Sequence, residues 1–272
     1  MSEVKIISGW TNPGGSTVAH INLCNLFNAN GIDCTLYGRH EWHADKCRSG
    51  FWWSMESIPE DTVILHYVNI TENPNFNKYV LSCHETNMYP IKNTEDNTLR
   101  PNLDQLDGIH YVSKLQKDWH GVNFPSVVIP NVVSKLTPKK VLRLVGKKRA
   151  GVIGSIDSHK QTHLSIKRAL DDGYENVLIY GKQNDPLYFE SEIVPLLKGG
   201  VVGMGHEDDK QKMYDSVDIV YHSSVRETYN YVRAECTLAD VEYNGLESAD
   251  GEPALWSDEE LLDAWTSFLE IE

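Results

Sequence analysis

Short apolar runs separated by amphipathic stretches repeat along the whole chain. The first runs predict strands at 4–8 and 33–37. The helix expected between them is capped by Ser16 and ends at Asn30 and Gly31. Further runs predict buried strands at 62–67, 79–83, 108–112 and 126–129, with a helix at 114–120. This alternation is typical of parallel sheets with helices on both faces.

The pattern restarts near residue 150 and continues to the end of the chain. Strands are expected at 150–154, 176–180, 200–202 and 218–222, and helices at 162–171, 187–197 and 208–216. A last helix at 257–269 has Ser257 as its cap, acidic residues in its first turn and an apolar stripe. Two such series predict two α/β domains.

Composition and net charge argue against some classes of protein. The chain has 272 residues, of which 40% are hydrophobic, and carries a net charge of −14, which argues against a protein that coats nucleic acid nonspecifically. No stretch reaches the length of an apolar membrane span, and residues 1–9 lack a signal layout. The five cysteines are scattered within apolar patterns, so we expect reduced thiols and a cytoplasmic protein: Cys24, Cys34, Cys47, Cys83 and Cys236.

Residues 38–53 interrupt the strand pattern with aromatic and charged side chains. His40, His43 and Cys47 make a partial metal set, but no second cluster completes it, so no metal is expected. Two alternatives remain for Trp42, Trp52 and Trp53: ordinary packing, or stacking faces for a sugar or a base.

Glu227 and Glu235 stand eight residues apart, after the apolar run 218–224 and into the next helix. A carboxylate at the end of a strand and a second one two turns into the following helix can face the same side. They can accept hydrogen bonds from sugar hydroxyls, while the helix N-terminus holds phosphate oxygens. The alternative is that these are two exposed helix glutamates that have this spacing by chance.

Six short motifs occur in the same order as in a known enzyme family. Ser224, Glu227, Tyr229 and Glu235 match its glutamate motif. The other matches are Asn12-Pro13-Gly14-Gly15-Ser16, His84 after an apolar run, Val112-Ser113, Ile129-Pro130-Asn131, and Gly154 to Lys160. In these motifs, which cover nearly the whole chain, the protein resembles the retaining glycosyltransferases of family 4.

The resemblance implies an α/β protein with the GT-B fold, in which two Rossmann-like domains face each other across a cleft, in a compact version. The expected boundaries are 1–140 for an acceptor-side domain, 141–256 for a nucleotide-sugar domain, and 257–272 for a helix that packs back on the first domain.

The activity implied is transfer of a hexose or pentose from a nucleoside diphosphate sugar, without a metal or other cofactor. The acceptor is a hydroxyl of a saccharide, lipid-linked glycan, protein or hydroxymethylated DNA base. His84, Glu227 and Lys160 are the catalytic residues by resemblance. The donor-binding residues by resemblance are Gly14, Gly15, Ser155, Met204, Thr228, Tyr229, Asn230 and Glu235.

The chain departs from the family at several of these positions. Ser155 stands where the family has a phosphate-binding arginine, so either Arg226, Arg149 or His159 replaces that charge or the donor binds weakly. Thr228 and Asn230 replace glycines, and Asp240 replaces a small residue. These changes motivate an alternative, a non-catalytic sugar-nucleotide-binding or partner subunit with the same fold.

The segment 135–149 holds seven basic residues and no acidic one. It is either a solvated linker or a basic wall that attracts an anionic partner, such as DNA or the donor's diphosphate.

Overall fold

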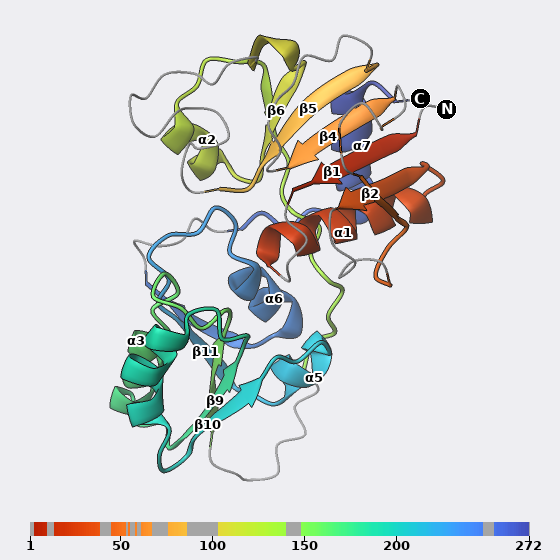
Figure 1. Ribbon diagram of the computed structural model, residues 1–272. Helices are drawn as coiled ribbons and strands as arrows, with labels where there is room; N and C mark the ends of the chain where they lie inside the picture. Colours follow the sequence, from red (N-terminus) through yellow and green to blue (C-terminus); the bar gives the residue numbers. More distant parts are fainter. Residues whose placement is uncertain are drawn as a thin grey trace. The chain divides into compact units, whose positions relative to one another are not determined.

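The chain folds into two compact units, which we call unit 1 and unit 2 (Figure 1). Unit 1 comprises Met1–Val133 and Ala254–Glu272, and unit 2 comprises Ser134–Pro253. The sequence places this division seven residues later, between 140 and 141. The computed structural model describes residues 3–9, 14–38, 45–52, 54, 58, 61–66, 76–85, 103–139, 148–246 and 253–271.

Unit 1 is built on a parallel sheet with the strand order β3-β2-β1-β4-β5-β6-β7. Its strands are β1 (Val4–Ser8), β2 (Cys34–Gly38), β3 (Ser49–Phe51), β4 (Thr62–His66), β5 (Lys78–Cys83), β6 (Gly108–Tyr111) and β7 (Ser126–Val128). Its helices are α1 (Gly15–Ala29), α2 (Lys114–His120), α7 (Asp258–Leu269) and a 3₁₀ turn at Leu103–Gln105.

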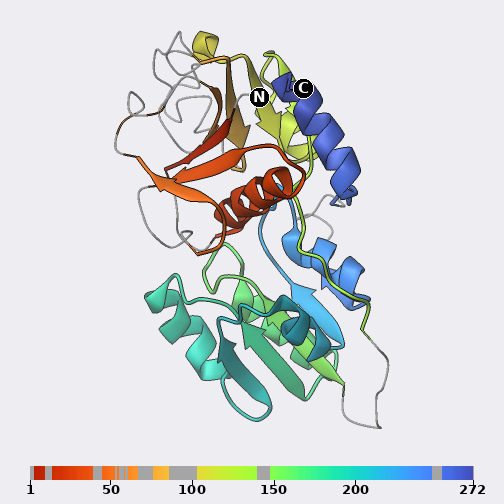
Figure 2. The same ribbon diagram turned by 90° about the vertical axis from the view of Figure 1, so that its right-hand side faces the viewer.

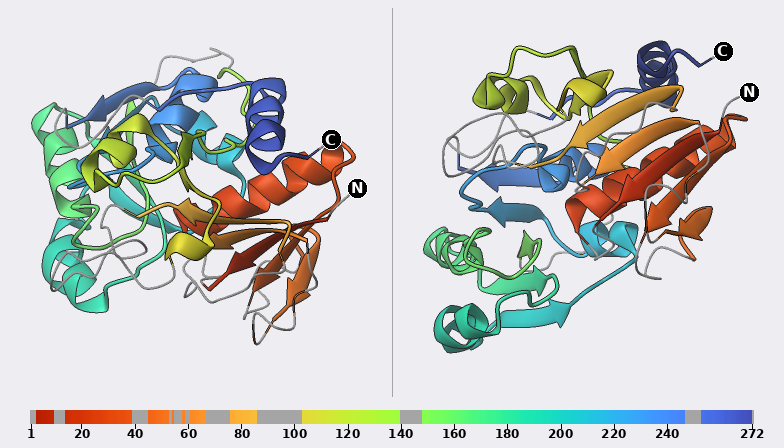
Figure 3. Two further views of the ribbon diagram at one scale, coloured as in Figure 1. Left: turned by 90° about the horizontal axis from the view of Figure 1, so that it is seen from above. Right: turned by 45° about the horizontal axis from the view of Figure 1, so that its top comes forward.

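Helices α1 and α7 pack against one face of this sheet (Figures 2 and 3). Val4 and Ile6 of β1 point to that face, where Phe27 of α1 meets Trp265 of α7 edge to face at 6.3 Å between ring centroids. Ile7 points to the opposite face, in a second core that also holds Trp52. The alternation follows from the two-residue period of a strand. The end of the chain therefore completes the core of the first unit.

The start of α1 differs from the prediction. Gly14 occupies the N-cap position and no side chain caps the helix, so the expected cap at Ser16 is wrong. Ser16 already lies within the first turn, beyond the position from which a hydroxyl can accept a cap hydrogen bond. At the other end Asn30 and Gly31, with φ of 81° at the glycine, stop the helix as expected.

Unit 2 has a parallel sheet in the order β10-β9-β8-β11-β12. Its strands are β8 (Arg149–Ile153), β9 (Asn176–Tyr180), β10 (Val201–Gly205), β11 (Ile219–His222) and β12 (Glu242–Gly245). Helix α3 (Thr162–Asp171) covers one face, and α5 (Lys210–Asp215) and α6 (Tyr231–Ala239) cover the other. The two parallel α/β series predicted from the sequence are thus confirmed.

Residues 187–197 do not form the regular helix that was expected. A short α4 (Pro186–Tyr188) leads into a π-helical turn at Phe189–Ile193 and a 3₁₀ turn at Val194–Leu196. Pro195 lies in this segment and has no N–H to continue an α-helical ladder. The edge strands β3 and β12 were not predicted at all, because their short sequences carry little apolar alternation.

Gly181 directly follows β9, and its backbone lies against that of Gly154, which directly follows β8. A Cβ atom at this position would stand 1.7 Å from the carbonyl oxygen of Gly154. We expect Gly181→Ala to lower the free energy of unfolding by about 2–3 kcal/mol, because the backbone cannot move away cheaply. Chemical denaturation followed by circular dichroism measures the change.

Gly203→Ala is the matched control, since no atom lies within 4 Å of a Cβ built there. Equal stability of the two variants would show that the backbone next to Gly181 yields.

Candidate functional site

Glu227 and Lys160 meet at the carboxyl edge of the sheet in unit 2. Lys160 follows the turn after β8, and Glu227 lies in the loop after β11. These two strands are parallel neighbours, so their carboxyl ends lie side by side. The Nζ atom of Lys160 lies 2.5 Å from Oε1 of Glu227.

His222 completes this cluster from the last position of β11. Its Nε2 atom lies 3.1 Å from the same Oε1 of Glu227 and donates to it. Burial raises the pKa of Glu227, but the hydrogen bond from His222 and the charge of Lys160 outweigh it and lower the pKa to about 2. Glu227 is therefore an ionised hydrogen-bond acceptor at any physiological pH. Arg168 of α3 donates to the carbonyl oxygen of His222 at 3.2 Å and so holds the strand end in place.

His159 ties the two loops of the cluster together. Its carbonyl oxygen accepts from the backbone N–H of Val225 at 3.0 Å, and its Nε2 lies 3.0 Å from the carbonyl oxygen of Arg226. The ring nitrogen donates here, because a carbonyl oxygen only accepts. Arg226 is thereby fixed, through its backbone, beside the turn that carries Lys160.

The Ser155 side chain is used locally. Its hydroxyl donates to Oδ2 of Asp157 at 2.7 Å, while Oδ1 of Asp157 accepts from the backbone N–H of Lys160 at 2.9 Å. Asp157 shapes the turn that presents Lys160. The position that holds an arginine in the resembling family thus holds a neutral side chain bonded to a carboxylate.

Glu235 lies apart from this cluster in α6, with only 3% of its surface exposed. Its Oε1 is paired with Nζ of Lys210, and its Oε2 accepts from the hydroxyl of Tyr214 at 2.8 Å. The carboxylate is well stabilised, because both oxygens have partners. The Lys210 side chain is 28% exposed and covers the ring of Tyr231, with Nζ 5.6 Å from its centroid.

The residues between the two glutamates shape the start of α6. Asn230 is its N-cap, with Oδ1 accepting from the N–H of Arg233 at 3.0 Å, and its φ of −84° is ordinary. Its Nδ2 donates to the hydroxyl of Tyr243 at 2.7 Å. Thr228 is half-buried, whereas Tyr229 is buried against Tyr231. Asp240, at φ 53°, closes the helix in the left-handed conformation.

Two predicted residues lie away from the cluster. Met204 is exposed on the edge strand β10, two strands from β8, or about 10 Å across the sheet. Arg149 begins β8, at the amino edge, about 13 Å along the strand from its carboxyl end. Of the three candidates to replace the missing arginine, Arg149 is therefore excluded by the topology.

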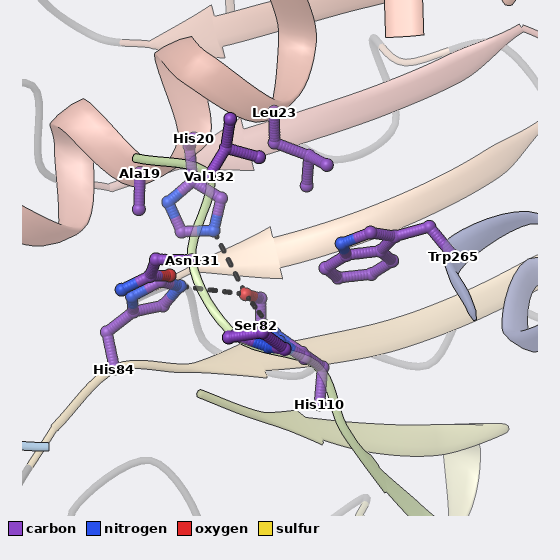
Figure 4. A pocket seen from close by; sticks show the side chains of 10 residues that line it. Ala19, His20, Leu23, Ser82, His84, His110, Asn131, Val132 and Trp265 are labelled. Carbon is purple, nitrogen blue, oxygen red and sulfur yellow. Dashed lines mark hydrogen bonds between the residues drawn. The ribbon is translucent and has the colours of Figure 1, made fainter. Parts of the chain in front are cut away.

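In unit 1, His84 directly follows β5, and Gly14 and Gly15 form the start of α1. Asn12 and Pro13, which precede them in the same motif, lie outside the described residues. The ring of His84 packs against that of His20 on α1, with 4.5 Å between centroids. A small pocket beside them, shown in Figure 4, is lined also by Ser82, His110, Asn131 and Trp265.

The structure resolves part of the question raised by residues 38–53. Trp52 is buried in the core of unit 1, as ordinary packing predicts, and Cys47 packs on the α1 side. His40, His43, Trp42 and Trp53 lie outside the described residues. Within the described ranges, no three His, Cys, Asp or Glu side chains are grouped so that they could hold a metal ion.

Of the basic segment, Lys139 is bound within unit 2, since its Nζ lies 3.0 Å from Oδ1 of Asp218. Residues 140–147 of this segment lie outside the described residues. Lys139 is thus a structural partner of Asp218 and not part of a basic wall.

Sequence reasoning missed His222, Lys210 and Tyr214. His222 could have been identified from the sequence, because it ends the strand before the glutamate motif. Lys210 and Tyr214 lie four residues apart on α5, so both point to the same side of that helix, toward Glu235. Nothing in the sequence indicates which buried carboxylate that side of α5 meets.

Comparison with solved structures identifies the architecture. No protein-family model and no curated protein sequence matches the chain. A glycosyltransferase from Rickettsia africae aligns over 99% of this chain and 88% of its own, with a TM-score of 0.68 and 14% identity. Sucrose-phosphate synthase from Thermosynechococcus elongatus aligns over 100% and 90%, with a TM-score of 0.67 and 13% identity. Anabaena HepE, solved with UDP and glucose, aligns over 92% and 82%, with a TM-score of 0.66 and 12% identity.

The chain has the GT-B fold. At these identities the likeness concerns the fold alone. The GT-B assignment agrees with the fold expected from the motifs, and the structural neighbours are glycosyltransferases. Among the described residues, no helix is both long and apolar enough to cross a membrane.

The buried histidines of unit 1 predict sensitivity to acid. Burial lowers the pKa of His20 to about 4 and that of His110 to about 3, against an ordinary value of 6.5. Below pH 6.5 the unfolded chain binds these protons while the folded chain does not, so the free energy of unfolding should fall from about pH 6.5 down to about pH 4. Urea unfolding of the full chain across this pH range measures how the free energy of unfolding changes with pH.

His110→Asn should flatten that slope, whereas substitution of the exposed His206 by Asn should not. Identical slopes in both variants would exclude His110 as a source of the acid sensitivity.

Proposed function

We propose that the protein is a retaining glycosyltransferase of the family 4 type that uses a nucleoside diphosphate sugar and no metal ion. The observation that carries this proposal is the ionised Glu227 held between Lys160 and His222 at the carboxyl edge of the sheet in unit 2. An anionic acceptor directly beside a cation suits a ligand that combines sugar hydroxyls with a diphosphate. The GT-B fold of the chain supports the same reading.

Glu227 binds the hydroxyls of the transferred sugar in this proposal. With a pKa of about 2 it carries no proton to donate, so it accepts hydrogen bonds and does not act as a general acid. His222 keeps Oε1 oriented, which leaves Oε2 for the sugar. Transfer with retention then proceeds as the acceptor oxygen bonds to the anomeric carbon and the bond to the diphosphate breaks, while the proton of the acceptor hydroxyl passes to the departing diphosphate oxygen.

Lys160 stabilises the departing diphosphate, whose negative charge grows as the sugar–oxygen bond breaks. It reaches the diphosphate by exchanging part of its contact with Glu227 for the phosphate oxygens. Met204 lies beside the base and Glu235 beside the ribose. The backbone around Ser155, Thr228, Tyr229 and Asn230 shapes the donor site of unit 2. The roles that the resemblance gives to Gly14, Gly15 and His84 of unit 1 are retained as part of the proposal.

The acceptor is a hydroxyl of a saccharide, lipid-linked glycan, protein or hydroxymethylated DNA base, and the reaction takes place in the cytoplasm. The described cysteines, none of which forms a disulfide, agree with a reducing compartment. A net charge of −14 weighs against DNA and favours a neutral acceptor.

A panel of uridine, guanosine and adenosine diphosphate sugars tests the function directly. The wild type should hydrolyse one of them slowly in the absence of an acceptor. Lys160→Ala should lower the turnover number about 100-fold while changing donor affinity much less, because the charge it stabilises develops in the transition state. Rates and binding are measured on the same preparations.

Lys167→Ala, an exposed lysine on α3, is the matched control and should behave as wild type. No hydrolysis of any donor by the wild type, or equal rates for the two lysine variants, would overturn the proposed function.

Arg226 is the cation that we expect to replace the family's arginine at Ser155. Its backbone is fixed beside Lys160 by His159, whose own Nε2 already binds the Arg226 carbonyl. Arg226→Gln should weaken binding of the preferred nucleoside diphosphate about 10-fold, because a charge-assisted hydrogen bond is lost. The corresponding nucleoside should bind unchanged, as calorimetry of both ligands measures.

Adding Ser155→Arg to that variant should restore most of the affinity. An unchanged affinity in Arg226→Gln would remove Arg226 from the diphosphate site without touching the function itself.

A non-catalytic sugar-nucleotide-binding subunit is the second candidate. The neutral Ser155 bonded to Asp157, and a Glu235 whose two oxygens both have partners within the chain, favour it. It predicts donor binding in the panel above without hydrolysis, and transfer to no acceptor.

A further inference from the structure

The ammonium group of Lys210 covers a buried carboxylate in unit 2. Lys210 is the first residue of α5, and its Nζ is paired with Oε1 of Glu235 on α6. The other carboxylate oxygen, Oε2, accepts from the hydroxyl of Tyr214 at 2.8 Å. Burial and the neighbouring Glu235 raise the pKa of Tyr214 well above its ordinary value, so this hydroxyl keeps its hydrogen and donates it. Both oxygens of Glu235 therefore have a partner from the same helix, α5.

Solvent reaches the ammonium group and hardly reaches the carboxylate. The side chain of Lys210 is 28% exposed, whereas that of Glu235 is 4% exposed. A ligand that approaches this place from solvent therefore meets the N–H groups of Lys210 before it can meet Glu235. The carboxylate acts through Lys210, as the partner that fixes the position of the ammonium group.

An aromatic ring holds the ammonium group from a second side. Nζ of Lys210 lies over the face of Tyr231, 5.6 Å from the ring centroid, and Tyr231 packs edge-on against Tyr229 at 5.3 Å between centroids. A cation is attracted to the face of an aromatic ring at this distance. An ammonium group has three N–H donors. Among the described residues, Glu235 is the one hydrogen-bond acceptor for them, so donors remain for a ligand.

Lys210 stays in this position when a ligand binds. It is the one cation that the described residues place on Glu235. Withdrawal of Lys210 would leave a buried carboxylate without a compensating charge, which is strongly unfavourable. The ligand group must therefore come to the ammonium group, because the ammonium group does not leave Glu235 to reach the ligand.

The place of α5 in the fold puts this contact at the end of the donor site that takes the base. Helix α5 follows β10, whose Met204 lies beside the base in the proposed function (Figure 1). Glu227 and Lys160 follow β11 and β8, and β10 is two strands from β8, or about 10 Å across the sheet. Nucleotides bind along this carboxyl edge of open α/β sheets. A donor that lies along the edge has its diphosphate near Lys160 and its base near Lys210.

We propose that Lys210 is a specificity-determining residue that donates a hydrogen bond to a carbonyl oxygen of the nucleotide base. The inference rests on the proposed function, which supplies the nucleotide and its orientation. Uracil and guanine carry a carbonyl oxygen at the ring position where cytosine and adenine carry an amino group. An ammonium group only donates, so it pairs with the carbonyl oxygen and meets a second donor in the amino group. The donor is therefore a uridine or guanosine diphosphate sugar, and Glu235 is the positioning residue for Lys210.

Binding of nucleoside diphosphates to the full chain tests this contact without requiring turnover. Two matched pairs differ at the ring position in question: UDP with CDP, and inosine diphosphate with ADP. Inosine diphosphate has the carbonyl group of guanine and lacks its amino group, so the second pair isolates this position. In at least one pair, calorimetry should show the carbonyl member binding about 10-fold to 100-fold more tightly, the range for a hydrogen bond to a charged group. The pair that shows the difference identifies the base.

Lys210→Met should abolish this preference by weakening binding of the carbonyl member, because methionine keeps most of the length of the side chain and removes the donor. Lys212→Met is the matched control. Lys212 lies on the same helix, is 71% exposed and is paired with Glu207. Its substitution should leave the affinities of both members as in the wild type.

Equal affinities within both pairs in the wild type, tighter binding of the amino members, or an unchanged preference in Lys210→Met would overturn the inference. If Lys210→Met does not fold, Lys210→Met combined with Glu235→Gln decides, since this variant leaves no unbalanced charge and should also bind both members equally.

The same measurements separate this inference from the proposed function. If the wild type prefers the carbonyl members yet hydrolyses no nucleotide sugar, the proposed transferase activity fails and the contact of Lys210 stands. If the wild type hydrolyses a nucleotide sugar and binds the members of both pairs equally, the inference alone fails. Binding of no nucleoside diphosphate at all would overturn both.

Discussion

The charge of Glu227 is the constraint on which the site in unit 2 depends. This carboxylate is largely buried away from water. In such surroundings its ionised form would be unfavourable without partners. Lys160 and His222 reverse the balance, and each comes from a different strand end. The two strands must therefore stay in register, with Arg168 holding the end of β11 and His159 joining the loops. Loss of any of these supports would leave a buried charge uncompensated, so the local structure and the ionisation of Glu227 depend on each other.

Much of the fold could be predicted from hydrophobic periodicity. Strands buried on both faces give continuous apolar runs, and β1, β9, α2 and α3 have the bounds that the pattern indicated. Strands β3 and β12 were not predicted, because their short sequences carry little apolar alternation. The irregular segment 186–196 was not predicted, because the spacing of apolar residues does not take into account that Pro195 lacks a backbone N–H donor.

The candidate site was predictable in part, for a different reason. Glu227 and Lys160 could be named because they stand at fixed distances from strand ends. Their partner His222 could have been named on the same ground. Lys210 and Tyr214 belong to another helix, and their contact with Glu235 depends on how α5 and α6 pack, which no local pattern encodes. The same holds for His20, Ser82 and His110, which come together in unit 1 although they are up to 90 residues apart in the chain.

The position of α7 has a consequence for the order of events during synthesis. Leu261, Trp265 and Leu269 belong to the core of unit 1, although the chain reaches them only after all of unit 2 has been made. A growing chain therefore emerges from the ribosome with the part of this core that packs against α7 still uncovered, and unit 2 becomes complete before unit 1 does. Premature termination anywhere before α7 yields a chain with that part of the core exposed, which is the kind of surface that chaperones and proteases recognise.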